Sequence, residues 1–85
     1  MGQGIYVVGI LVDNRASRAP EVQDVLTRHG STILSRNGIP DPSRSRGIIT
    51  VTMQADQADS EKFTAELRGI EGVRAQAMHL GEALN

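Results

Sequence analysis

The sequence predicts an α+β fold of the ferredoxin-like type: a four-stranded antiparallel sheet with two helices on one face, in the order βαββαβ. Three observations lead to this prediction. The spacing of apolar residues along the chain predicts, in order, a strand, a helix, two strands, a helix and a last strand. The 85 residues suffice for one domain. Two split βαβ units with right-handed crossovers place both helices on the same side of the sheet. We therefore expect a single domain over residues 1–80 and a flexible tail over 81–85.

The first strand is expected at Ile5–Val12, where apolar residues occupy both alternating faces. Such a strand is typical of the middle of a sheet. A helix follows, because Val22, Val25, Leu26 and His29 recur at helical spacing. Gly30 is the expected end of that helix.

The second strand is expected to be short, Ile33 to Arg36. Asn37-Gly38, followed by Pro40 and Pro42, is typical of a turn and a loop. We therefore expect the strand to end before Asn37.

The second half of the chain repeats the pattern. Residues 47–54 alternate cleanly, with Ile49, Val51 and Met53 on one face and Ile48, Thr50 and Thr52 on the other, so a third strand is expected there. A second helix should follow, with Asp56 or Asp59 as its N-cap and an apolar stripe of Phe63, Leu67 and Ile70. Gly72 is expected to end this helix, and Val73–Leu80 to form the last strand.

The composition excludes several classes of protein. There is no cysteine, so disulfides and thiolate metal sites are absent. The formal charge of −1 gives no overall attraction to nucleic acid. The apolar run in MGQGIYVVG is far shorter than the roughly 20 residues that span a bilayer, and no basic segment precedes it. We expect a cytoplasmic protein with no membrane association and no direct nucleic-acid binding.

The predicted topology leaves one face of the sheet without helices. On that face the first strand still presents large apolar side chains, and an uncovered apolar face is typical of an interface. A chain of this length also buries a modest fraction of its surface alone. We therefore expect a homo-oligomer, a dimer or tetramer formed through the sheet.

The segment ILVDNRASRAPEVQDVLTRHGSTI, Ile10 to Ile33, resembles the first strand and helix of ACT domains, the amino-acid-sensing modules of biosynthetic regulation. The similarity covers the acidic-Asn-Arg turn and the residues Val22, Leu26, Arg28, Gly30 and Ile33. It departs at one place. ACT domains that bind amino acids carry Pro-Gly in that turn, where this chain has Ala16-Ser17, and the glycine lets a ligand approach the backbone closely.

Nearly the whole chain resembles the ACT-like family of iron-only hydrogenase system regulators. The similarity lies in the first strand ending in Val-Asp, the run ILSRNGIP, the strand GIITVTM and the junction LRGIEGVRAQAM. This family shares its fold with the C-terminal domain of the nickel-responsive repressor. The resemblance implies a regulator of transcription or metabolism linked to the iron-only hydrogenase system.

The turn before the first helix is the candidate ligand site, formed by Asp13, Asn14, Arg15, Ala16 and Ser17. Free N–H groups at a helix N-terminus, with an arginine beside them, favour an anion such as a carboxylate or phosphate. The structural alternative is that Asn14 or Ser17 simply caps the helix.

A second cluster of arginines, Arg36, Arg44 and Arg46, flanks the loop with the two prolines. Arg36 is a candidate anion contact, because guanidinium groups pair well with carboxylates and phosphates. The alternative is that these are solvated surface charges.

Metal binding, catalysis and RNA binding have little support. His29 and His79 are fifty residues apart and have no cysteine partner, whereas transition-metal sites need three or four ligands. Acylphosphatases share the topology and place an arginine near the position of Arg15, but their Gly-rich turn is absent here. One Tyr and one Phe make no base-stacking platform. The sequence thus predicts a non-enzyme with no cofactor and no metal.

Two hypotheses remain. In the first, the domain is a homo-oligomeric platform that serves another protein as a partner. In the second, it is a sensor of a small anion, an amino acid or a phosphate-bearing metabolite, bound at the turn Asp13 to Ser17. The Ala16-Ser17 pair favours the platform.

Overall fold

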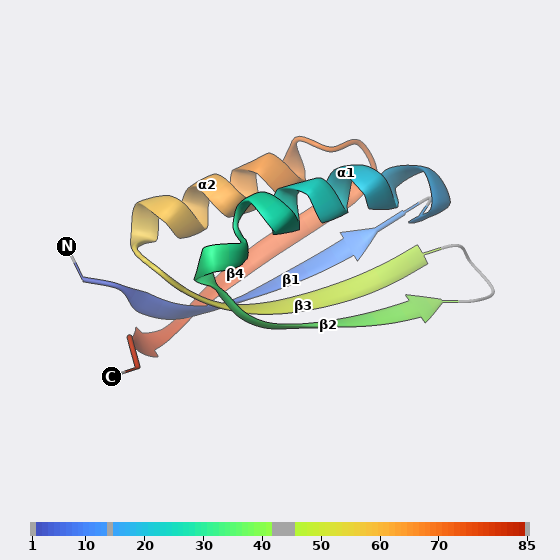
Figure 1. Ribbon diagram of the computed structural model, residues 1–85. Coiled ribbons are helices and arrows are strands. Elements are labelled where there is room, and N and C mark those ends of the chain that lie inside the picture. Colours follow the sequence, from blue (N-terminus) through green and yellow to red (C-terminus); the bar gives the residue numbers. More distant parts are fainter. Residues whose placement is uncertain (1, 14, 42–45, 85) are drawn as a thin grey trace.

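The computed structural model describes residues 2–13, 15–41 and 46–84, and it shows two helices packed on one face of a four-stranded sheet (Figure 1). The strands lie in the order β2-β3-β1-β4, and all neighbours are antiparallel. This is the α+β arrangement that the sequence predicts. The elements are β1 (Gly4–Val12), α1 (Arg15–Arg28), a 3₁₀ turn η1 (Gly30–Thr32), β2 (Ile33–Asp41), β3 (Arg46–Ala55), α2 (Gln57–Arg68) and β4 (Val73–Glu82).

The core lies between the helices and the sheet. Alternate residues of β1 and β3 face the helices, because successive side chains of a strand point to opposite sides. Phe63 and Leu67 of α2 and Leu26 of α1 pack onto them and are essentially inaccessible to solvent. The remaining core side chains are Val8, Ile10, Val12, Val22, Val25, Val51, Met53, Ala55, Ile70, Val73 and Ala75.

β1 is central, between β3 and β4, as its apolar composition predicts. Gly4 at its start allows close packing, because a Cβ there would lie 2.7 Å from Nε2 of His79. His79 in turn packs against Tyr6, with ring centroids 5.0 Å apart. Both aromatic residues of the chain, Tyr6 and Phe63, therefore lie on the helix side of the sheet.

The prediction that β2 ends before Asn37 is wrong. The strand continues to Asp41, pairing Gly38 with Ile49 and Pro40 with Gly47. β2 is an edge strand, and an edge strand accepts a proline because only one of its sides needs ladder hydrogen bonds. Pro42 lies outside the described residues.

The prediction that Gly72 ends α2 is also wrong. The helix ends at Arg68, and Gly69 is its C-cap, with its N–H donating to the carbonyl oxygen of Ala65. Gly72 lies in the following turn with φ of 82°. The predicted N-cap is confirmed at Asp56, whose carboxylate accepts the N–H of Asp59 at 2.8 Å.

The last strand extends two residues beyond its expected end, to Glu82. The N–H of Leu84 donates to Oε1 of Gln54 on β3, at 3.0 Å. The mobility of the tail stays a prediction. None of the described helices is long and apolar enough to span a membrane.

Candidate functional site

The face of the sheet opposite the helices is the first candidate site, and we call it the open face. The pairing register assigns residues to it, since paired residues on neighbouring strands share a face. It comprises Ile5, Val7, Gly9 and Leu11 of β1; Ser35, Asn37 and Ile39 of β2; Ile48, Thr50, Thr52 and Gln54 of β3; and Arg74, Gln76 and Met78 of β4.

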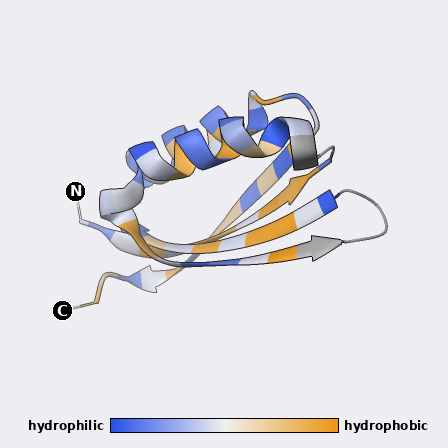
Figure 2. Cartoon of the chain, turned by 45° about the vertical axis from the view of Figure 1, so that its right-hand side comes forward, coloured by the Kyte–Doolittle hydropathy of each residue, from blue (hydrophilic) through white to orange (hydrophobic). Residues whose placement is uncertain are grey.

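Large apolar side chains of the open face are exposed to solvent. Ile39 and Met78 are each 57% exposed and Ile48 is 47% exposed. Figure 1 shows both helices on the other side of the sheet, and Figure 2 shows hydrophobic segments along the strands. Among these fourteen described residues Arg74 is the only charged one, and it lies on the edge strand β4; Arg46, which shares this face by the alternation of β3, lies at the start of that strand in an ion pair with Asp13. The open face thus carries apolar side chains on all four strands, and Thr50 and Thr52 are polar residues of the central strand β3.

The turn between β1 and α1 is the second candidate site, and neighbouring residues hold it in place. The N–H of Asp13 donates to the carbonyl oxygen of Gly72 at 2.8 Å. The Asp13 carboxylate accepts Nε of Arg46, also at 2.8 Å. Arg18 of α1 reaches across to Glu71, with Nη2 3.0 Å from Oε1. These contacts tie the end of β1 to the start of β3 and to the turn after α2.

The structure locates only part of the predicted ligand set. α1 begins at Arg15, so Arg15, Ala16 and Ser17 form its first turn, as the anion hypothesis requires. Asn14 and the side chains of Arg15 and Ala16 lie outside what the structure describes. Neither the anion role nor the capping role of this turn is therefore tested.

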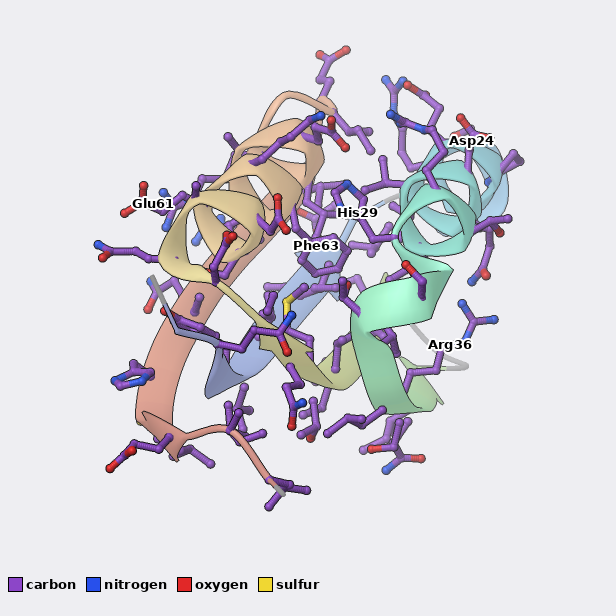
Figure 3. The ribbon with its side chains drawn as sticks, turned by 60° about the vertical axis from the view of Figure 1, so that its left-hand side comes forward. Asp24, His29, Arg36, Glu61 and Phe63 are labelled. Atoms are coloured by element: carbon purple, nitrogen blue, oxygen red, sulfur yellow. The ribbon has the colours of Figure 1, made fainter. Side chains whose placement is uncertain are left out.

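Of the three arginines predicted near the loop, Arg46 is the one that the structure places at the turn. Arg36 pairs with Val51, which in turn pairs with Val8. Five residue steps, roughly 17 Å of strand, separate that row from Asp13. Arg36 is exposed on β2 beside α1 (Figure 3), and its role as an anion contact stays a prediction for a different part of the surface. Arg44 lies outside the described residues.

The contact between Asp13 and Arg46 was missed by the sequence reasoning, which grouped Arg46 with the loop arginines. The signal that could have found it is the register. Val12 pairs with Gly47, so the residues that follow and precede them, Asp13 and Arg46, must be neighbours.

The two histidines lie in separate environments. His29, at the end of α1, contacts Glu66 and Phe63 of α2 (Figure 3), whereas His79 packs on Tyr6 between β4 and β1. Within residues 2–13, 15–41 and 46–84, no three His, Asp or Glu side chains are grouped so that they could hold a metal ion.

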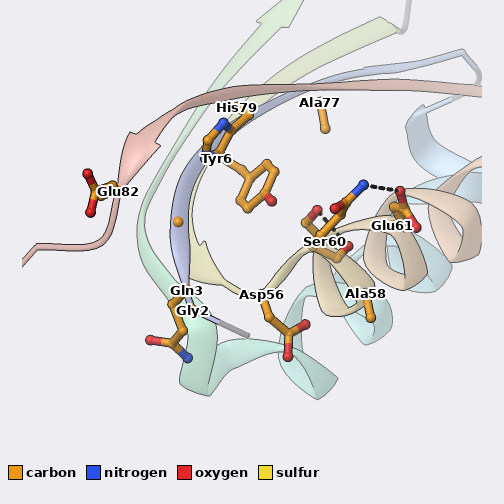
Figure 4. A pocket seen from close by; sticks show the side chains of 12 residues that line it. Gly2, Gln3, Tyr6, Asp56, Ala58, Ser60, Glu61, Ala77, His79 and Glu82 are labelled. Carbon is orange, nitrogen blue, oxygen red and sulfur yellow. Dashed lines mark hydrogen bonds between the residues drawn. The ribbon is translucent and has the colours of Figure 1, made fainter.

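A hollow of about 860 Å³ opens at the N-terminal end of α2 (Figure 4). Tyr6 and His79 line it from the strands. The two acidic groups that α2 contributes already have partners, since Asp56 caps the helix and Glu61 accepts a hydrogen bond from Gln57 at 3.1 Å.

Comparison with known proteins decides the family. Residues 4–77 match the family described as "TM1266-like: Iron-only hydrogenase system regulator, putative". The chain belongs to this family. The description of the family is that of a regulator, and a regulatory role fits the domain. No curated protein matches the chain.

Solved structures agree with this assignment. The uncharacterized protein TM1266 of Thermotoga maritima is similar over 92% of this chain and 98% of its own, with 26% identity and a TM-score of 0.88. The C-terminal domain of the MgtC protein of Mycobacterium tuberculosis is similar over 98% of this chain and 94% of that domain, with 19% identity and a TM-score of 0.71. The second likeness shows the shared fold alone.

Proposed function

We propose that this member of the TM1266-like family is a non-catalytic regulatory domain that works as a homo-oligomeric platform, with the open face as its self-association surface. The platform would present its helices to a protein partner in the regulation of transcription or metabolism. The observation that carries the proposal is the exposure of Ile39, Ile48 and Met78 on a face without helices. The expected cytoplasmic location stays a prediction.

The size of the open face supports a stable contact. Four strands about 4.8 Å apart, with about nine residues of about 3.3 Å each, project to roughly 570 Å². The accessible area is larger than this projection because side chains protrude. Standard interfaces bury about 800 Å² per partner, so pairing through this one face approaches what a specific dimer needs.

The experiment is light scattering on the wild type and on charge variants of β3. Thr50→Lys and Thr52→Glu place a charge on the open face, where desolvation in an interface would be costly. We expect a wild-type dimer or tetramer at roughly 10–100 µM and monomers for both variants. Thr27→Lys, the same change as at residue 50 but on the exposed side of α1, is the matched control and should leave the oligomer intact. A monomeric wild type in this range contradicts the proposal.

A second candidate function is the sensing of a small carboxylate or phosphate at the turn Asp13 to Ser17. The observation that favours it is Arg46, which neutralises the Asp13 carboxylate beside the first turn of α1. Without this neutralisation, Asp13 would repel an anion from the helix N-terminus.

Thermal unfolding with amino acids, nucleotides and phosphorylated metabolites tests the sensor. A ligand at a hundredfold excess over its Kd stabilises the folded state by about 2.7 kcal/mol and so raises the Tm. Arg15→Ala should remove that rise, while Arg74→Ala, on the open face, should keep it. If no compound in the screen changes the Tm, the turn is a structural junction only.

A further inference from the structure

Gly9 occupies an unusual place, the middle of the central strand β1 on the open face. Its backbone is that of an ordinary strand, because among the described glycines only Gly72 has a positive φ. A Cβ added at Gly9 would meet no atom within 4 Å. A glycine inside a strand lowers stability and often marks the close approach of another chain or ligand. Nothing within the described part of the monomer therefore requires a glycine here.

The missing side chain leaves a hollow on the open face. The hollow measures about 390 Å³, and Gly9 is among the residues that line it. Leu11 of β1 also lines it, with Ile48 of β3 on one side of that strand and Arg74 and Gln76 of β4 on the other. Its walls thus offer apolar contact on one side and polar side chains toward the sheet edge.

We propose that this hollow is a socket for Met78 of a second copy of the chain, so that each Met78 enters the partner's hollow at Gly9. This inference rests on the proposed self-association through the open face and names the contact that determines its specificity. Met78 is 57% exposed. Its unbranched, flexible side chain suits an irregular hollow.

The position of Met78 is compatible with a two-fold symmetric dimer. Gly9 pairs with Gln76, and Val7 pairs with Met78, so Gly9 and Met78 are diagonal neighbours on adjacent strands, roughly 7–8 Å apart. In a two-fold contact, if Met78 of one copy meets Gly9 of the other, the reverse contact forms as well. One contact repeated by symmetry therefore fills both sockets.

Charge explains why the occupant is a second copy. A two-fold interface brings a face against itself, so any charge at its centre would meet the same charge. Two described arginines lie on the open face: Arg74 borders the hollow from the edge strand β4, and Arg46 lies at the start of β3. The ion pair of Asp13 and Arg46 lies at the end of the strands. The centre of the open face can thus meet its own copy without repulsion.

The test is the dimer dissociation constant of Gly9→Val and Met78→Ala, measured by sedimentation. Gly9→Val fills the socket and should raise the Kd about tenfold or more, while the monomer keeps its fold, because valine suits a strand better than glycine. Met78→Ala should also raise the Kd. Gly38→Val is the matched control: it is an exposed strand glycine with equal room for a Cβ, but it lies on the helix side and should leave the Kd unchanged.

The variant that carries both Gly9→Val and Met78→Ala tests the contact itself. If the two substitutions acted at independent sites, their fold-losses would multiply, whereas groups in direct contact give a combined loss well below that product. A wild-type dimer that Gly9→Val leaves as tight as before overturns the socket and leaves the platform standing. Losses that multiply overturn the assignment of Met78. A wild type that stays monomeric overturns both the platform and the socket. Circular dichroism of each variant monitors folding.

Discussion

His29 joins the two helices through contacts of two kinds. Its Nε2 lies 2.8 Å from Oε1 of Glu66, and its ring meets Phe63 edge-on, with centroids 5.0 Å apart. From the sequence, His29 was expected only as one of the residues that recur at helical spacing in the first helix. The partners on α2 could not be predicted, because they depend on how the helices pack against each other. A hydrogen bond from His29, opposed in part by desolvation, holds the pKa of Glu66 below its usual value of 4.5.

This shift predicts a pH-dependent contribution to stability. A carboxyl group with a lowered pKa in the folded state stabilises the fold above its unfolded pKa, and the contribution is lost as the pH falls through the folded value. Glu66→Gln should therefore lower the Tm at about pH 5, and its difference from the wild type should shrink toward about pH 3. Glu61→Gln removes the same charge from the exposed side of α2 and is the control. A difference for Glu66→Gln that stays constant over this range would contradict the assignment.

Gly69 and Gly72, which both follow α2, differ in backbone conformation and therefore in their expected roles. Gly69 has φ of −73°, which any residue adopts, whereas Gly72 has φ of 82°. Gly72→Ala should cost about 1–2 kcal/mol of unfolding free energy from backbone strain, since an added Cβ meets only ordinary contacts, the nearest 3.5 Å away. Gly69→Ala should be neutral or slightly stabilising. Urea unfolding of both variants measures the contrast, and equal losses would refute it.

The elements that were predicted correctly are those whose signal is local. The alternation of β3 and the cap at Asp56 are properties of neighbouring residues, and both are confirmed. The errors at Gly38 to Pro40 and at Gly72 have a common cause. Glycine and proline usually end helices and strands. Here the edge strand β2 accommodates Pro40. The carbonyl oxygen of Gly72 accepts a hydrogen bond from the N–H of Asp13, which follows β1. Such roles depend on tertiary pairing.

The candidate site, like the elements, could be predicted only where its signal is local. The open face follows from the alternation of each strand, so Thr50 and Thr52 could be assigned to it from sequence. The phase of β1 could not, because both of its faces are apolar. Only the register with β3 shows that Gly9 lies on the open face and Ile10 in the core. The ion pair of Asp13 with Arg46 likewise could not be predicted without the pairing of β1 with β3.

At the scale of the whole molecule, the proposed oligomer makes a prediction about salt. Association through the open face depends on apolar burial, since its described charged residues, Arg46 and Arg74, lie at the start of β3 and on the edge strand β4. Salt screens charge interactions over a Debye length of about 10 Å at 0.1 M and about 3 Å at 1 M. The Kd should therefore change little between these two concentrations of sodium chloride, and sulfate should tighten association, because it strengthens apolar burial. Because only the folded chains associate, the Tm should also rise with protein concentration. Sedimentation over the salt concentrations measures the Kd, and calorimetry over the protein concentrations measures the Tm. A Kd that weakens steeply with sodium chloride would mean that charged surfaces, and not the open face, hold the copies together.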